Sequence, residues 1–228
     1  MSSSEPTSSR YVVGVDLGRQ NDPTAIVAVR RDEFPSVTID GRLVEVPALF
    51  RVGFSERVPL GTPYPAVVQR VANLLKTTPF IGADLVIDQT GVGVAVADMF
   101  RSAGMHFTGV VIHGGDAVNS DGMTWRVPKM VLISRLQALM AEDRLHVHAD
   151  LPDVAALREE LLDYETEQLP SGRVTFNAPP GRHDDLVMAL AIAVWKAHGA
   201  TNVPPMIAFM HEEIIAAGLS PDALIRRI

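Results

Sequence analysis

Cysteine is absent from the 228 residues of this chain, so disulfides, thiolate zinc sites and cysteine nucleophiles are excluded. Lysine is scarce too: only Lys76, Lys129 and Lys196 are present among 20 basic residues, and the rest are arginine. No apolar run reaches the roughly 20 residues that a membrane-spanning helix needs. These absences exclude a disulfide scaffold, a thiol enzyme and a helical membrane protein.

The composition is that of an ordinary globular protein, with 47% hydrophobic and 21% charged residues. The length fits one domain, or one domain with a small appendage. The formal net charge is −7, whereas proteins that bind nucleic acid over their whole surface are usually basic. A local basic stripe matters more than this sum. Residues 1–10 are rich in serine and lack the apolar segment of a secretory signal, so we expect a disordered leader.

The hydrophobic pattern predicts a mixed α/β fold. Residues 11–18 form a short apolar run ending in Asp and Gly, and residues 24–31 follow a turn, which together predict a β-hairpin. Further strands and helices alternate after it. We expect helices over 65–77, 94–103, 128–144, 152–167 and 183–198, and strands over 84–88, 106–112 and 173–177. The pattern predicts one domain over 11–199, a mixed sheet with helices on both faces, followed by a linker and helical tail over 200–228.

Four carboxylates stand at the ends of these elements. Asp16 ends the first strand, Asp88 ends a later strand, and Asp184 and Asp185 open the last long helix. Ligand sites in open α/β sheets lie at the carboxyl ends of parallel strands. Carboxylates that meet there repel one another and need a cation, and oxygen ligands favour Mg²⁺ or Mn²⁺.

Each carboxylate also has a structural interpretation. Asp16 and Asp88 are each followed by residues typical of turns. Asp184 and Asp185 are suited to cap the helix and to interact with its dipole, which is the commoner use of acids in a first turn. Only the set of four, with two of its members ending apolar strands, predicts a site.

Three segments carry a resemblance to a known family: YVVGVDLGRQNDPTAIVAV, LVIDQTGVG and GRHDDLVMALAIAVW. In this order and spacing they resemble the nuclease domain of phage terminase large subunits, which has a ribonuclease-H-like fold. The segment VPKMVLISRLQALMAEDRLHV resembles the family's helix before its last strand. The resemblance spans about residues 11–198.

This resemblance implies a metal-dependent endonuclease that cuts concatemeric double-stranded phage DNA during packaging, in the host cytoplasm, with two Mg²⁺ or Mn²⁺ ions. Asp16 and Asp88 match the first two metal-binding carboxylates. The third falls on Asp184 or Asp185, with a slight preference for Asp185. Many relatives have another Asp where this chain has Met188. The helix of this chain therefore offers fewer ligands for a second metal ion.

The resemblance to terminase large subunits, which are DNA-packaging motors, also implies partners for this chain. Members of this family carry an ATPase domain with a GxxxxGK[ST] loop, and none of the three lysines here lies in such a loop. We therefore expect an excised nuclease domain or a motor on another chain. The partners implied are double-stranded DNA, that ATPase domain, the small terminase subunit and the portal protein, with no membrane.

Several further residues are candidates for DNA contact. Trp125, Arg126 and Lys129 lie between a polar loop and a helix start, where they would form a phosphate-binding patch; alternatively, Trp125 packs in the core and the two basic residues are solvated. Arg19 follows Asp16 and would reach the scissile strand, or else belongs to a plain turn. His183 precedes the Asp pair as an assisting residue or a helix cap.

Three other functions remain open from the sequence. The turn after the first strand also resembles the phosphate-binding turn of sugar kinases and actin, although one domain is too short for their two lobes. The acidic set equally suits another ribonuclease-H-like nuclease, such as a junction resolvase. A non-catalytic docking domain of a packaging motor would retain the same acids.

Overall fold

The computed structural model describes residues 5–18, 22–91, 93–122, 124–163, 165–168, 174–177, 183–199 and 225–226. Within them five helices and thirteen strands are present. The helices are α1 (Tyr64–Leu74), α2 (Gly93–Ser102), α3 (Lys129–Ala141), α4 (Val154–Asp163) and α5 (Asp185–His198). The strands are β1 (Ser8–Asp16), β2 (Thr24–Glu33), β3 (Val37–Ile39), β4 (Arg42–Val44), β5 (Leu49–Val58), β6 (Asp84–Asp88), β7 (Thr108–His113), β8 (Asn119–Ser120), β9 (Thr124–Pro128), β10 (Leu145–His148), β11 (Glu165–Gln168), β12 (Val174–Asn177) and β13 (Ile225–Arg226).

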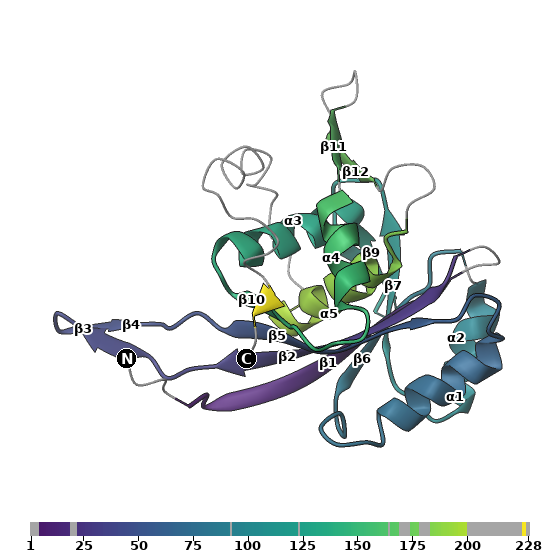
Figure 1. The fold of residues 1–228 in the computed structure, drawn as a ribbon, viewed down its shortest axis with the longest axis horizontal. Helices are drawn as coiled ribbons and strands as arrows, with labels where there is room; N and C mark the ends of the chain where they lie inside the picture. Colours follow the sequence, from purple (N-terminus) through teal and green to yellow (C-terminus); the bar gives the residue numbers. More distant parts are fainter. Residues whose placement is uncertain are drawn as a thin grey trace.

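Nine strands form one mixed sheet in the order β13-β10-β5-β2-β1-β6-β7-β9-β8. The strands β1, β2 and β5 are antiparallel neighbours, while β1, β6, β7 and β9 run parallel. Helices α3, α4 and α5 lie on one side of this sheet, and α1 and α2 lie on the other (Figure 1). The predicted architecture, a mixed sheet with helices on both faces, is confirmed.

Some boundaries differ from the sequence-based expectation. Strand β1 begins at Ser8 and pairs with β2 from there, so the end of the expected leader, residues 1–10, belongs to the sheet. Helix α4 ends at Asp163, and β11 follows where the helix was predicted to continue to residue 167. Strand β11 pairs with β12, a partner that helical periodicity does not reveal. The helical tail expected over 200–228 lies outside the described residues, except for β13, which pairs with β10.

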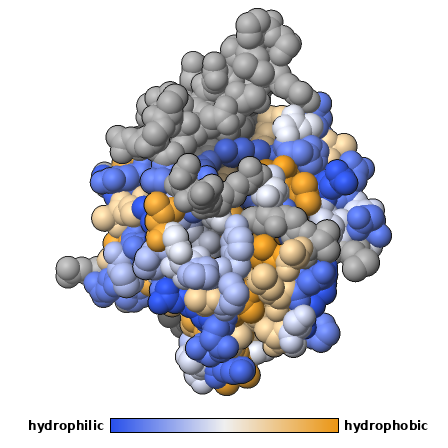
Figure 2. Space-filling view, turned by 90° about the vertical axis from the view of Figure 1, so that its right-hand side faces the viewer, coloured by the Kyte–Doolittle hydropathy of each residue, from blue (hydrophilic) through white to orange (hydrophobic). Residues whose placement is uncertain are grey.

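The alternation of side chains along the strands divides the interior into two apolar clusters. Val12 of β1 packs in the cluster that includes α5, whereas Val13 packs in the cluster that includes α1 and α2. None of the described helices is long and apolar enough to cross a membrane. Among the coloured residues in Figure 2, hydrophilic and hydrophobic side chains are mixed on the surface.

Helix α5 is the central packing element and is buried along almost its whole length. It crosses β1 at Gly14, where an added Cβ atom would lie 2.1 Å from the backbone oxygen of Ala189 and 2.9 Å from the Cβ of Ala193. Glycine on the strand and alanine on the helix therefore allow the two backbones to approach closely. This contact fixes the position of α5 along β1, and so places the N-terminal end of the helix near the end of the strand.

We predict that Gly14→Ala lowers the free energy of unfolding by about 1–3 kcal/mol, because an extra methyl group must displace α5 or β1. Gly53→Ala in β5 is the matched control, since no atom lies within 4 Å of its added Cβ atom. Urea denaturation of both variants measures the difference. Equal stability of the two variants would contradict the close contact.

Candidate functional site

Strand pairing and side-chain alternation place Asp16 and Asp88 together. The two residues are directly aligned in the parallel register of β1 and β6. Gly14 and Val86, each two residues earlier, face α5. Because alternate residues of a strand share a face, the side chains of Asp16 and Asp88 lie on the α5 side of the sheet.

The N-terminal end of α5 completes the carboxylate group. Asp184 is the residue before the first helical turn, and Asp185 is the first helical residue. All four carboxylates line one pocket of about 280 Å³. The pocket also contains Leu17, Gly18, Asp22, Pro23, Thr90, Ile112, Lys129, His183 and Met188. The structure thus brings together the four acidic residues that the sequence singled out.

Two of these carboxylates have well-defined donors on neighbouring elements. Asp88 Oδ1 accepts hydrogen bonds from the backbone N–H of Thr90 at 2.8 Å and from its hydroxyl at 2.5 Å. The Thr90 hydroxyl oxygen in turn accepts from the N–H of Ile112 on β7. Lys129 Nζ, at the start of α3, lies 2.8 Å from Asp184 Oδ2. These contacts hold both carboxylates at the pocket.

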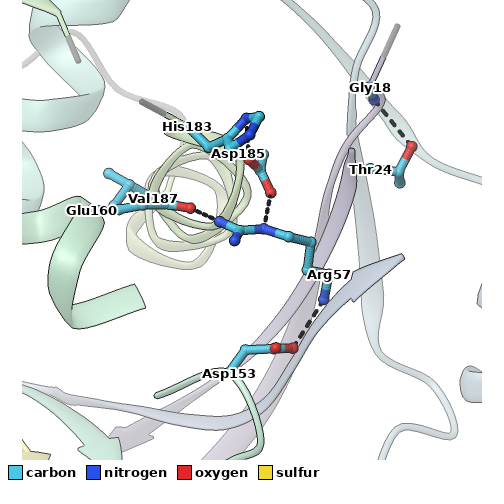
Figure 3. A network of polar contacts seen from close by, with 8 residues as sticks. All are labelled: Gly18, Thr24, Arg57, Asp153, Glu160, His183, Asp185 and Val187. Atoms are coloured by element: carbon cyan, nitrogen blue, oxygen red, sulfur yellow. Dashed lines mark hydrogen bonds and ion pairs between the residues drawn. The ribbon is translucent and has the colours of Figure 1, made fainter. Parts of the chain in front are cut away.

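Asp185 has one satisfied and one unsatisfied oxygen. Its Oδ2 accepts a hydrogen bond of 2.8 Å from Nε of Arg57, which extends from β5 toward the N-terminal end of α5 (Figure 3). Its Oδ1 is buried and has no hydrogen-bond partner among the described residues. Nδ1 of His183 lies 3.8 Å from this oxygen, beyond hydrogen-bonding distance. An anionic oxygen left in this way is costly unless a cation or a donor occupies the pocket.

The electrostatics of the pocket point the same way. Burial, followed by repulsion from Asp88, Asp184 and Asp185, raises the pKa of Asp16 well above the ordinary value, and Lys129 opposes this effect. Burial also raises the pKa of Asp185, although the hydrogen bond and charge of Arg57 lower it. The pocket therefore lacks positive charge relative to its carboxylates.

The donor set fits a hard divalent cation. Carboxylate oxygens are the ligands that Mg²⁺ and Mn²⁺ prefer, and the unsatisfied oxygen of Asp185 supplies one of them. Among the described residues, no three His, Asp or Glu side chains are already grouped as metal ligands. Since Lys129 holds Asp184, a cation that binds this carboxylate would displace the lysine, whereas the contact of Arg57 with Asp185 leaves Oδ1 available.

The other predicted residues are distributed unevenly. Lys129 and His183 line the pocket, and His183 is exposed. Trp125 is partly buried against the α5 cluster and meets Trp195 edge-on, with ring centroids 5.5 Å apart. Arg126 follows it on β9 and is exposed, so the alternation directs it to the opposite face. The predicted phosphate patch is therefore not assembled as one group, and Arg19 lies outside the described residues.

Sequence reasoning missed Asp22, a fifth carboxylate on the pocket lining, as well as Thr90, Arg57 and Glu160. Thr90 follows Asp88 by two residues, so an Asx-type turn was foreseeable from the Asp-Gln-Thr-Gly sequence. Arg57 and Glu160 reach α5 from elements distant in sequence, and no local pattern indicates them.

No protein-family model matches this sequence, and no curated protein matches it either. Solved structures do resemble it. The large terminase nuclease from thermophilic phage G20c matches with bound magnesium (TM-score 0.57, 23% identity, 84% of each chain) and with bound cobalt (TM-score 0.56, 24% identity, 84% of each chain). The large terminase nuclease domain of Thermus phage P74-26 matches with TM-score 0.54 and 20% identity, over 85% of this chain and 83% of that one. The chain therefore has the ribonuclease-H-like fold of these domains, as its sequence indicated.

We predict that Asp16→Asn raises the melting temperature of the metal-free protein at neutral pH, because a neutral amide removes a buried charge and its repulsion from the other carboxylates. The unfolded Asp16 has an ordinary carboxyl pKa and the folded one a raised pKa. The wild-type protein therefore loses stability as the pH rises from the ordinary value through the raised one.

Thermal denaturation in EDTA between pH 4 and pH 8 measures this slope, which we expect to be smaller in Asp16→Asn. Asp84→Asn, at the exposed opposite end of β6, is the control. Addition of Mn²⁺ should stabilise the wild-type protein and the control but not Asp16→Asn. A wild-type stability that rises over this pH range would contradict the prediction.

Proposed function

We propose that this chain is a metal-dependent DNA endonuclease, the nuclease domain of a phage large terminase subunit. The observation that carries the proposal is the convergence of Asp16, Asp88, Asp184 and Asp185 in one pocket of a ribonuclease-H-like fold. The similar nuclease structures from phage G20c, with bound magnesium and with bound cobalt, support a divalent cation as the cofactor.

Asp16, Asp88 and Asp185 would hold the first ion, and Asp184 would hold a second after release from Lys129. Bound Mg²⁺ or Mn²⁺ in such a site lowers the pKa of a water and stabilises the charge of a phosphodiester in its transition state. We infer that a second ion binds more weakly, because the position one turn along α5 is the apolar side chain of Met188.

The residues around the carboxylates would bind and orient the DNA. Among the described residues, Lys129 is the one lysine or arginine that lines the pocket. Helices α3 and α5 both begin at the pocket, with the positive ends of their dipoles directed there. The backbone after Asp16 is held at Gly18, whose N–H donates to Thr24 and whose carbonyl oxygen accepts from Tyr64. The backbone at Gly18 is therefore a fixed edge of the pocket, against which a DNA strand would bind.

The substrate that fits best is double-stranded DNA, held in place by the ATPase domain, the small terminase subunit and the portal protein. The net charge of −7 predicts weak binding by this chain alone, with few phosphate contacts and a strong dependence on salt. We therefore expect slow cleavage with little sequence preference.

The decisive experiment is cleavage of supercoiled plasmid with Mn²⁺, with Mg²⁺ and with EDTA. We expect relaxation and then linearisation with either metal, faster with Mn²⁺, and none with EDTA. Asp88→Asn and Asp185→Asn should lose at least about 100-fold in rate, as expected when a metal ligand is removed. Asp84→Asn, on the same strand as Asp88 but outside the pocket, should cleave like the wild type.

Metal-independent cleavage, or cleavage unaffected by both substitutions, would overturn the proposal. Preference for four-way junctions over linear duplexes would instead identify a junction resolvase. Failure to cleave together with failure to bind Mn²⁺ in a calorimetric titration would identify a docking domain.

Lys129 and Arg126 provide a separate test of the phosphate contact, because only the first lines the pocket. We predict that Lys129→Gln lowers the cleavage rate about tenfold, as the loss of one charge-assisted hydrogen bond would. Arg126→Gln should change the rate less than about twofold, as expected of an exposed charge. Equal losses in the two variants would show a diffuse basic surface instead of a contact at the pocket.

A further inference from the structure

We propose that Arg57 is the positioning residue of Asp185: it holds one oxygen of this carboxylate and leaves the other for a divalent cation. The inference rests on the proposed metal site but concerns a residue outside its set of carboxylates. It is carried by the geometry around Arg57, by the unsatisfied oxygen of Asp185 and by an irregularity in β5.

Arg57 is fixed at three points (Figure 3). Its Nε donates to Asp185 Oδ2 at 2.8 Å, and its Nη2 forms an ion pair with Glu160 Oε1 of α4. Its backbone N–H donates to Asp153 Oδ2 at 2.9 Å, immediately before α4. The guanidinium therefore has one orientation, set by two helices and by its own strand.

Glu160 ties this arrangement to the helix that carries Asp185. Its second oxygen, Oε2, accepts a hydrogen bond of 3.0 Å from the backbone N–H of Val187, in the first turn of α5. A carboxylate at this point satisfies a free N–H group and interacts favourably with the helix dipole. Arg57 thus lies between two almost buried carboxylates. Asp185 belongs to the N-terminal end of α5, and Glu160 of α4 is hydrogen-bonded to the same end.

The chemistry of the contact requires arginine. Two carboxylates must be neutralised from two directions, and the planar guanidinium presents several N–H donors in a rigid arrangement. A lysine ammonium would reach one carboxylate and remain mobile. Because Nε occupies Oδ2 of Asp185, the rotation of this side chain is restricted and Oδ1 is left unsatisfied beside the pocket.

An extra residue in β5 directs Arg57 to this side of the sheet. The register between β2 and β5 shifts at Gly53: Val29 pairs with Val52, whereas Ala28 pairs with Phe54. Val52 packs in the α5 cluster, and Phe54 packs in the opposite one, although the two are separated by two positions. The bulge therefore reverses the alternation, so that Arg57 faces α5 and Glu56 faces α1, where it pairs with Arg70.

The test compares Arg57→Gln and Arg57→Lys with the wild-type full chain in a calorimetric Mn²⁺ titration. We expect Arg57→Gln to weaken Mn²⁺ binding about tenfold or more, as loss of a group that orients a metal ligand does. The Mn²⁺ affinity of Arg57→Lys should lie between those of the wild type and Arg57→Gln. Arg70→Gln is the matched control, because it breaks an ion pair to the neighbouring residue of β5 on the other face, and it should bind Mn²⁺ like the wild type.

Circular dichroism and thermal denaturation in EDTA identify variants that fold. A folded Arg57→Gln with wild-type Mn²⁺ affinity would overturn the proposal. If Arg57→Gln does not fold, Arg57→Lys decides: weaker Mn²⁺ binding supports the proposal and unchanged binding overturns it.

The outcomes also separate this inference from the proposed function. A wild-type chain that binds no Mn²⁺ overturns both. Mn²⁺ binding that depends on Arg57 but is accompanied by no DNA cleavage supports the positioning role and counts against the nuclease. In a cleaving protein, Arg57→Gln should lower kcat with little change in the KM for DNA, because Arg57 does not line the pocket.

Discussion

Repulsion among the carboxylates that line one pocket is the constraint on which this structure depends. Asp16, Asp88, Asp184 and Asp185 are held together by elements that are stable for other reasons, chiefly the apolar contact of α5 with the sheet. Free carboxylates would move apart into water, and the packing of α5 prevents this. The site therefore lowers the stability of the fold, as functional sites commonly do. The raised pKa of Asp16 is the local sign of that cost.

The position of each carboxylate follows from strand geometry and from one close helix contact. Parallel register aligns Asp16 with Asp88, and alternation turns both toward the same layer. Gly14, two residues before Asp16, admits the backbone of α5, so the N-terminal end of that helix meets the ends of β1 and β6. The same residues that pack the helix therefore also place the acids, and a small shift of α5 would separate Asp185 from Asp16.

Much of this arrangement could be predicted from the sequence because its signals are local. Asp16 and Asp88 end apolar runs, and the Asp pair opens an apolar helical run, so the strands, the helix and the four acids were recognisable together. The role of Arg57 could not be predicted, because the bulge at Gly53 reverses the alternation that a regular strand would have. Trp125 and Arg126 are adjacent in sequence but point to opposite faces, so their proximity indicated a patch that the sheet divides.

Arg57 and Lys129, the two basic side chains that contact the carboxylates, differ in chemistry and therefore in role. Arg57 is bound through both its side chain and its backbone, and it lies between two carboxylates that would repel each other without it. Removal of such a central cation would leave buried negative charge uncompensated, so we expect Arg57 to stabilise the metal-free protein as well. Lys129 holds Asp184 with a flexible side chain ending in a single ammonium group. A metal that takes over Asp184 would release Lys129 toward the phosphate that the metal attracts. The divalent cation would then supply the positive charge that the pocket lacks, while Lys129 changes partner.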